Sequence, residues 1–411
     1  MGSGLRVVAS PCPTETIYLG LAIDAGTRHE YPAESGMAHF VEHLTFKGTS
    51  SLTSRQIISR MESVGGELNA FTGKEETVYY CSCQRQYFRR ATSLLFDIVF
   101  HSTYPQTEMN KEVEVVIDEI ESYRDSPSEL IYDEFESLVF QGHPLGRSIL
   151  GEPDMLRSYK TENVCRFVRR LYMPSRTVLF VYGNIDVTRH INFLERLLSQ
   201  VEDCRPDGVS GCQEMLSLTG QAQTEVTASW KMTETPVSHH QAHVMMGGRA
   251  FGGTDARHLA LFLANNIMGG PGLSSRLNLA LREKRGLVYT VESNLTTYTD
   301  TGLWSVYFGC DHSDVARCKH IVENELHRFC SAPLSDKALR AAQRQLSGQI
   351  ALSYDNFENV AIGMGKRMLH YGTMRTKDEF VERILSLSAK EVWEAACEVF
   401  SPQRLTTLEY K

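Results

Sequence analysis

The hydrophobic positions of this chain follow two different periods, which alternate along the sequence. Stretches dominated by β-branched and aromatic residues predict strands at residues 16–25, 79–84 and 176–182. Stretches in which apolar residues recur every three or four positions predict helices at residues 36–48, 54–64, 86–101, 109–124 and 186–201. Strands that alternate with helices indicate an α+β or mixed α/β fold, and we expect an α+β fold with mixed sheets.

One segment near the middle of the chain interrupts this pattern. Residues 203–222 are rich in turn-forming residues, beginning with Asp203, Pro206, Asp207 and Gly208. We therefore predict an N-terminal domain at 1–205, a linker at 206–222 and a C-terminal domain at 223–411.

The two halves also resemble each other over a short stretch. The segment Ala38–Gly48 aligns without a gap to Ala260–Gly270, and both segments are apolar, helical in period and end in glycine. A match this short could arise by chance; if the two halves are duplicates, only the first needed the three polar residues on this helix. The alignment sets His39, Glu42 and His43 opposite Leu261, Ala264 and Asn265.

Composition narrows the class of protein. The 411 residues are 42% hydrophobic and 22% charged, which is typical of a folded globular chain. A net charge of −8 argues against nucleic acid as a partner, because its phosphates require a basic surface. The chain shows neither a secretory signal nor a segment able to span or anchor to a membrane, so we expect a cytoplasmic protein.

The ten cysteines are scattered without the spacing of a metal-binding motif. Reduced thiols are the simpler interpretation for a chain of this size. Cys81 and Cys83 lie two positions apart in a predicted strand and therefore share one face, so they are a candidate metal pair. We expect them to be packing residues instead.

The residues with the most informative chemistry lie in the helix predicted at 36–48. At about 100° per residue, His39, Glu42 and His43 project within an arc of about 100°. The alternative is a solvated polar face that happens to contain two histidines. The apolar residues around them favour a buried helix, and buried ionisable groups need a compensating partner. Two imidazoles one turn apart are suited to bind Zn²⁺, and the carboxylate between them is suited to accept a proton from water.

The pattern His-x-x-Glu-His is the inverted form of the zinc-peptidase motif, the inverzincin signature. On this motif the chain resembles the M16 (pitrilysin-like) zinc metallopeptidases, and by its length it resembles the subfamily of mitochondrial processing peptidase and its bacterial homologues. The resemblance implies two homologous domains that form a clamshell. It also implies that His39 and His43 bind zinc and that Glu42 is the general base.

The resemblance also supplies a third zinc ligand, which composition alone cannot choose among 50 acidic residues. The family has a ligating glutamate on a separate helix, and Glu119 matches it, 76 positions after His43. Glu112 lies two helical turns earlier, on nearly the same face, and the resemblance implies that it supports the site from behind the ligands. Without the family, both would pass as residues of a solvated acidic helix.

A second cluster lies in the C-terminal half. Arg282 and Tyr289 have the spacing of an Arg/Tyr pair that, in the family, reaches the substrate at the zinc site. A guanidinium and a phenol can stabilise the oxyanion of a tetrahedral intermediate. Read alone, the segment is the C-terminus of a helix capped by Gly286, and both interpretations can hold. Pro271 in the preceding glycine-rich turn departs from the family pattern.

The glycines Gly65 and Gly66 lead into a predicted strand. In the family the matching strand is an exposed sheet edge on which the peptide substrate pairs as an added strand. The resemblance therefore makes Asn69, Ala70 and Phe71 the candidate substrate contacts, and an ordinary β-hairpin is the alternative.

The sequence thus predicts a zinc-dependent endopeptidase, with one Zn²⁺ per chain, that hydrolyses extended peptides or unfolded segments. The resemblance implies a homodimer, with a heterodimer as the alternative. Two other functions compete with this prediction. One is a catalytically inactive structural or partner subunit of the same fold, against which the intact motif argues, and the other is a zinc hydrolase that does not cleave peptides.

Overall fold

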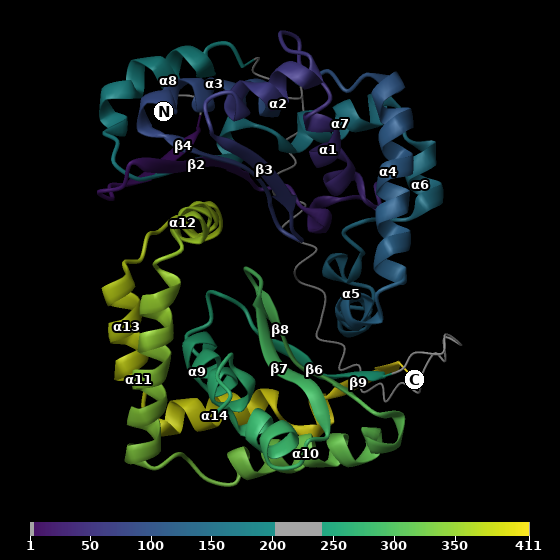
Figure 1. Cartoon of the computed structure of the whole chain (residues 1–411), viewed down its shortest axis with the longest axis vertical. Helices are drawn as coiled ribbons and strands as arrows, with labels where there is room; N and C mark the ends of the chain where they lie inside the picture. Colours follow the sequence, from purple (N-terminus) through teal and green to yellow (C-terminus); the bar gives the residue numbers. More distant parts are fainter. Residues whose placement is uncertain (1–3, 202–240, 411) are drawn as a thin grey trace. The chain divides into compact units, whose positions relative to one another are not determined.

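The computed structural model describes residues 4–201 and 241–410, so the predicted linker at 206–222 lies outside the described residues. The chain forms two compact units (Figure 1). The first comprises the described residues of Met1–Ile120, Arg147–Glu225 and Asn356–Met374. The second comprises the described residues of Glu121–Gly146, Val226–Asp355 and Arg375–Lys411.

The first unit is a five-stranded sheet with helices on both faces. Its strands are β1 (Arg6–Ser10), β2 (Thr16–Ile23), β3 (Glu67–Thr72), β4 (Thr77–Gln84) and β5 (Thr177–Tyr182). Its helices are α1 (Met37–Thr45), α2 (Ser54–Glu62), α3 (Phe88–Phe100), α4 (Gln106–Arg124), α6 (Pro153–Ser158), α7 (Thr161–Leu171), α8 (Ile191–Leu198) and α12 (Phe357–Tyr371). The three strands and five helices predicted from hydrophobic period correspond to β2, β4, β5, α1, α2, α3, α4 and α8, with ends that differ by a few residues.

The second unit has a four-stranded antiparallel sheet. Its strands are β6 (Ala242–Phe251), β7 (Val288–Thr297), β8 (Thr301–Cys310) and β9 (Thr406–Tyr410). Its helices are α5 (Pro127–Val139), α9 (His258–Gly269), α10 (Val315–Cys330), α11 (Asp336–Ser353), α13 (Lys377–Ser386), α14 (Ala389–Val399) and the π-helix Asn278–Glu283.

The two sheets share one topology. The order β5-β2-β4-β3 in the first unit matches β9-β6-β8-β7 in the second, and each corresponding pair of strands is antiparallel. Strand β1, paired parallel to β5, makes the first sheet mixed. Helix α1 follows β2 and helix α9 follows β6, so the two helices hold equivalent positions. The predicted α+β fold of two similar domains is confirmed, and the clamshell stays a prediction.

The interior strand β5, which lies between β1 and β2, shows why the sheet of the first unit needs helices on both faces. Leu179 and Val181 pack in the core beneath α1 and α3, whereas Val178 and Phe180 pack against α12 on the other face. Phe180 fits between two glycines, since a Cβ on Gly20 or on Gly365 would lie 2.4 Å from its ring. A strand that is buried on both faces has a continuous run of apolar residues in its sequence, as β5 has.

The second unit is completed in the same way by α5. Ile131, Phe135 and Phe140 of this segment pack against β6, β8 and β9 side chains such as Met245 and Tyr307. Helix α12 thus completes the first sheet and α5 the second, although each lies in the other half of the sequence. The compact units therefore differ from the predicted ranges 1–205 and 223–411 in two segments, 121–146 and 356–374.

The eight described cysteines are all free, and Cys81 and Cys83 are buried in β4 as packing residues. Cys204 and Cys212 lie outside the described residues. Within residues 4–201 and 241–410, we find no helix that is both long and apolar enough to cross a membrane.

Candidate metal centre

Helix α1 begins at a glycine that its surroundings require. Gly36 has φ 77°, and a Cβ there would lie 2.6 Å from the carbonyl oxygen of Leu150 and 2.7 Å from Cα of Gly151. The buried carboxyl group of Glu30 accepts hydrogen bonds from the N–H groups of Gly36 (3.2 Å) and Ala38 (2.9 Å). These bonds satisfy donors in the first turn that have no partner within the helix. The start of α1 is therefore fixed in register.

The apolar side of α1 is fully buried in the core, through Phe40, Val41 and Leu44. The helix cannot rotate without exposing these residues, so its other side is held in one orientation. That side presents His39 and His43, whose ring centroids lie 4.6 Å apart. The buried helix predicted from the sequence is confirmed.

Helix α4 brings a carboxylate to the two imidazoles. Oε2 of Glu119 lies 3.5 Å from Nε2 of His43 and 3.9 Å from Nε2 of His39. One ligand atom from each of the three residues lies within 4.8 Å of the others. In the described part of the chain, no other group of three or more His, Cys, Asp or Glu residues meets this criterion.

The three residues fit a catalytic zinc ion. Zinc binds imidazole nitrogen and carboxylate oxygen at about 2.0–2.2 Å, so tetrahedral ligands lie roughly 3.3 Å from one another. The observed separations of 3.5 Å and 3.9 Å are close to that spacing. Two histidines and one glutamate leave a fourth position free, as catalytic zinc sites require.

A second carboxylate supports His43 from behind. Nδ1 of His43 lies 3.0 Å from Oε1 of Glu112, whose other oxygen lies 2.6 Å from Nζ of Lys47. A proton on Nδ1, donated to Glu112, leaves Nε2 free to face Glu119 and a metal. This is the position that the resemblance implied for Glu112. The sequence analysis did not identify Lys47. Its position four residues after His43, about one helical turn, could have indicated that it lies beside the same carboxylate.

The pKa values of the two histidines are shifted in opposite directions. Burial and then the charge of His43 lower the pKa of His39 to about 4, so this imidazole is neutral near pH 7, as a metal ligand must be. Burial also acts to lower the pKa of His43, but hydrogen bonds with Glu112 and Glu119 outweigh it and raise the pKa to about 9. His43 must therefore release a proton when a metal binds.

Glu42 is held apart from the ligand set. Its Oε2 accepts a hydrogen bond of 3.0 Å from Oγ1 of Thr72, at the end of β3. Burial raises the pKa of Glu42, although the Thr72 hydrogen bond and the charge of His43 oppose this. Thr72 is a second residue that sequence reasoning missed, and its signal was its place at the end of the strand that carries Asn69, Ala70 and Phe71.

Strand β3 lies at the edge of the first sheet, as the resemblance implied, and pairs only with β4 among the described strands. Asn69 is exposed, whereas Ala70 and Phe71 are half-buried. The edge strand and Glu42 are thus joined through Thr72. An exposed edge has main-chain donors and acceptors with which an extended peptide can pair.

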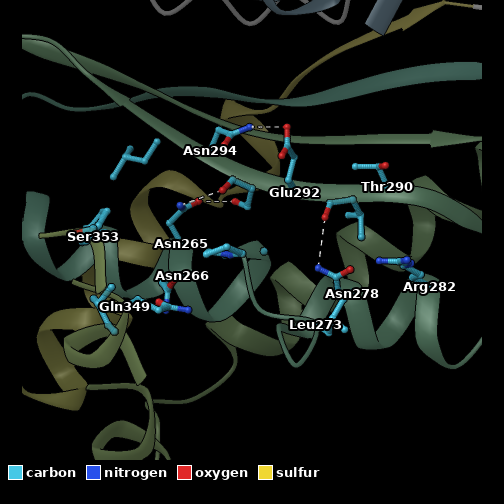
Figure 2. Close-up of a pocket in the computed structure, with 18 of the residues that line it drawn as sticks. Asn265, Asn266, Leu273, Asn278, Arg282, Thr290, Glu292, Asn294, Gln349 and Ser353 are labelled. Atoms are coloured by element: carbon cyan, nitrogen blue, oxygen red, sulfur yellow. Dashed lines mark hydrogen bonds between the residues drawn. The ribbon is translucent and has the colours of Figure 1, made fainter. Parts of the chain in front are cut away.

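Arg282 and Tyr289 lie in the second unit. Arg282 is exposed on the π-helix, and Gly286 ends this segment with φ 60° and an N–H bonded to the carbonyl of Arg282 at 2.8 Å. The predicted glycine cap is confirmed. Tyr289, at the start of β7, is 63% exposed. Both line a cavity of about 630 Å³ within this unit (Figure 2).

Two family models match the chain in succession. The model described as "Insulinase (Peptidase family M16)" matches residues 6–153, and "Peptidase M16 inactive domain" matches residues 159–346. The chain belongs to peptidase family M16. The zinc-ligand candidates and Glu42 of this M16 chain all fall within the first match, and Arg282 and Tyr289 fall within the second.

Relatives of this M16 chain are similar along almost its whole length. An uncharacterized zinc protease of Bacillus subtilis, YmxG, is 30% identical over 97% of this chain and 94% of the relative. One of Streptomyces coelicolor is 31% identical over 96% of this chain and 85% of the relative. The human mitochondrial-processing peptidase subunit beta is 29% identical over 95% of this chain and 79% of its own length.

Solved structures support the fold of this M16 chain. A protease from Helicobacter pylori superposes with a TM-score of 0.86 at 19% identity, over 100% of this chain and 97% of that one. A peptidase M16 inactive domain from Pseudomonas fluorescens gives a TM-score of 0.83 at 18% identity, over 99% and 95%. At these identities the likeness concerns the fold alone.

Proposed function

We propose that the chain is a zinc-dependent endopeptidase that hydrolyses extended peptides or unfolded protein segments. One observation carries this proposal, namely that His39, His43 and Glu119 converge from two helices, with Glu42, a carboxylate outside the ligand set, on the same helix face as the histidines. When bound, Zn²⁺ would polarise the scissile carbonyl and lower the pKa of a water molecule. One ion per chain follows, because the described residues form one such ligand set.

Other residues of the first unit transfer the proton and hold the catalytic groups in position. Glu42 accepts a proton from the attacking water and passes it to the leaving nitrogen, a role that its raised pKa suits. Thr72 holds one oxygen of Glu42 in place. Glu112, with Lys47 beside it, orients the His43 ring.

The edge strand supports a peptide as the substrate. A peptide that pairs with β3 would lie along Asn69, Ala70 and Phe71, and main-chain pairing accepts varied sequences because all peptides share the same backbone. The Thr72 contact supports a substrate on this strand being close to Glu42. Such an edge suits a peptide backbone better than a small molecule, which argues against a zinc hydrolase that does not cleave peptides.

Arg282 and Tyr289 are proposed to stabilise the oxyanion and the bound strand. Their chemistry supports this role, and both face a cavity rather than the core. We expect Arg282→Ala to lower kcat/KM by about 10²-fold or more without loss of zinc. The matched control is Lys284→Ala, an exposed residue two positions along that does not line the cavity. Equal rates for the two variants would remove this role.

The proposal also includes the oligomeric state of the chain. A homodimer is the predicted state, and the relative named as a subunit of mitochondrial-processing peptidase supports the heterodimer as the alternative. The inactive structural or partner subunit remains the competing function, and the complete ligand set speaks against it. The cytoplasmic location stays a prediction.

The decisive experiment is Glu42→Gln in a quenched-fluorescent peptide assay, with zinc content measured by mass spectrometry. We expect turnover to fall by about 10²- to 10⁴-fold while zinc is retained, because Glu42 is not a ligand. Glu114→Gln is the matched control, since that carboxylate lies exposed on α4. Equal turnover in wild type and Glu42→Gln would rule out the catalytic proposal and favour the inactive subunit.

A further inference from the structure

Three consecutive charged residues lie in the turn between strands β3 and β4. Lys74, Glu75 and Glu76 are all buried, with 5%, 6% and 5% of their surfaces exposed. Turns normally leave charged side chains in water, because a buried charge is costly unless it is paired. These three occur within the four residues that follow Thr72, the residue whose hydroxyl is bonded to Glu42.

Two of the three charges tie the turn to neighbouring segments of the first unit. Nη1 of Arg28 lies 2.6 Å from Oε1 of Glu75, and the main-chain N–H of Arg28 donates to the carbonyl oxygen of Lys74 at 2.8 Å. Nζ of Lys74 donates to the carbonyl oxygen of Arg147 at 2.5 Å. The approach is close, because a Cβ on Gly26 would lie 2.5 Å from the carbonyl oxygen of Lys74.

The third charge, Glu76, is held by helix α12. Its Oε1 lies 2.6 Å from Nζ of Lys366, and its Oε2 lies 2.8 Å from Nε2 of His370, one turn later on the helix. Burial acts to raise the pKa of Glu76, but the hydrogen bond with His370 and the charge of Lys366 outweigh it and lower the pKa. Glu76 is therefore an ionised carboxylate with a partner on each oxygen.

The same helix and the same glutamate reach the end of the edge strand. Nζ of Lys366 lies 5.9 Å from the ring centroid of Phe71, which precedes Thr72 in β3. Gly73, which follows Thr72, donates its N–H to the carbonyl oxygen of Glu76 at 2.7 Å. Thr72 thus lies between two residues that contact Lys366 or Glu76.

Stability alone does not explain these buried pairs. Apolar residues of similar size often stabilise a fold as well as a buried ion pair does. Charged groups joined by directed hydrogen bonds instead favour one arrangement of their partners. The arrangement favoured here is that of the end of β3, where Thr72 meets Glu42.

We propose that Glu76 is a positioning residue for Glu42 and acts through the edge strand. Helix α12 holds Glu76, Glu76 holds the end of β3, and Thr72 at that end holds one oxygen of Glu42. The inference rests on the proposed function, in which Glu42 is the general base. A general base must lie within hydrogen-bond reach of the water that it deprotonates, so a looser strand end lowers turnover while zinc is retained.

A double-mutant cycle on kcat tests this path. Thr72→Val keeps the shape of the side chain and removes the hydroxyl, and Glu76→Gln removes the charge. Both variants and their combination are measured in the full chain with the quenched-fluorescent peptide assay, together with zinc content. Glu409→Gln is the matched control, because this carboxylate is 9% exposed and lies 2.5 Å from Nζ of Lys319 in the other unit.

We expect Thr72→Val and Glu76→Gln each to lower kcat by about tenfold, and their combination to be about tenfold lower as well. Glu409→Gln should leave kcat unchanged. Single effects that multiply to about a hundredfold would overturn the role of Glu76 alone. A parent chain without turnover that depends on Glu42 would overturn the proposed function and this role together.

Amide hydrogen exchange of the zinc-free chain gives a second readout that needs no turnover. We expect the amide protons of residues 67–73 to exchange about tenfold faster in Glu76→Gln than in the parent, and at the parent rate in Glu409→Gln. If Glu76→Gln does not fold, Lys366→Met replaces it in both measurements, because His370 still holds the carboxylate there. Exchange at the parent rate in the variant measured would overturn the proposal.

Discussion

The two units use the same scaffold position for opposite kinds of chemistry. Helices α1 and α9 each follow the equivalent strand of a sheet with the same strand order. Helix α1 presents three ionisable residues, whereas the aligned positions of α9 are Leu261, Ala264 and Asn265, all buried. The second unit adopts the same strand order without ionisable groups at this position. Those of the first unit are therefore not there to hold the fold.

The two units also differ in the partners that their buried polar side chains have, which are charged in the first unit and neutral in the second. In the first, Glu119 and Glu112 from α4 and Lys47, just after the end of α1, surround the imidazoles with charge. In the second, Asn265 is satisfied by neutral partners, Ser293 and Trp304. A charged cluster can exchange protons and bind a cation, whereas a neutral one can only pair hydrogen bonds.

The most direct way to break this comparison is His43→Asn, which gives α1 the residue that α9 has at the aligned position. We expect loss of zinc and a fall in peptide turnover of at least about 10³-fold, because one ligand of three is removed. Metal analysis and the fluorescent peptide assay measure both. A variant that keeps its zinc and its turnover would show that His43 is not a ligand.

The reciprocal change is Asn265→Leu in the second unit. We expect the free energy of unfolding to fall by about 2–4 kcal/mol, since Trp304 Nε1 and the Ser293 hydroxyl lose a buried partner. Urea unfolding measures it, and zinc content should not change. Unchanged stability in Asn265→Leu would contradict the structural role of this amide.

Glu112→Gln tests whether the charged partner of His43 is needed for metal binding. We expect zinc affinity to weaken by about 10- to 100-fold, because the carboxylate that orients His43 is lost. Competition with a chelator measures the affinity, and Glu114→Gln, whose side chain is 62% exposed on the same helix, is the control. Equal affinities would mean that Glu112 only balances the charge of Lys47.

The last prediction concerns the cap of α1, and its effect is the smallest when taken per pH unit. Burial raises the pKa of Glu30 from 4.5 to about 8. The stability that protonated Glu30 contributes is therefore complete below pH 4.5 and is lost as the pH rises through about 8. Relative to Glu30→Gln, the wild type should lose at most about 1.4 kcal/mol of unfolding free energy for each pH unit between these values. A difference that stays constant with pH would contradict the buried, protonated carboxyl.

Part of the site was predictable from local spacing. His39, Glu42 and His43 share a helix face because the helical period requires it, and the apolar residues between them predicted burial. Glu119 required a family resemblance, since nothing local in α4 distinguishes it from its acidic neighbours. Thr72 and Lys47 came only from the structure, because their roles depend on which atoms meet across β3, α1 and α4.

The sequence by itself determined that two imidazoles and a carboxylate share one helix face. It also determined the alternation of strands and helices, and it pointed to two similar halves. Only the tertiary structure decided that α5 and α12 each complete the sheet of the unit formed by the other half. The physical reason is that periodicity reports which side of a segment is apolar and not which surface will cover it. Several surfaces satisfy the same apolar face, and the whole chain must fold before one of them is selected.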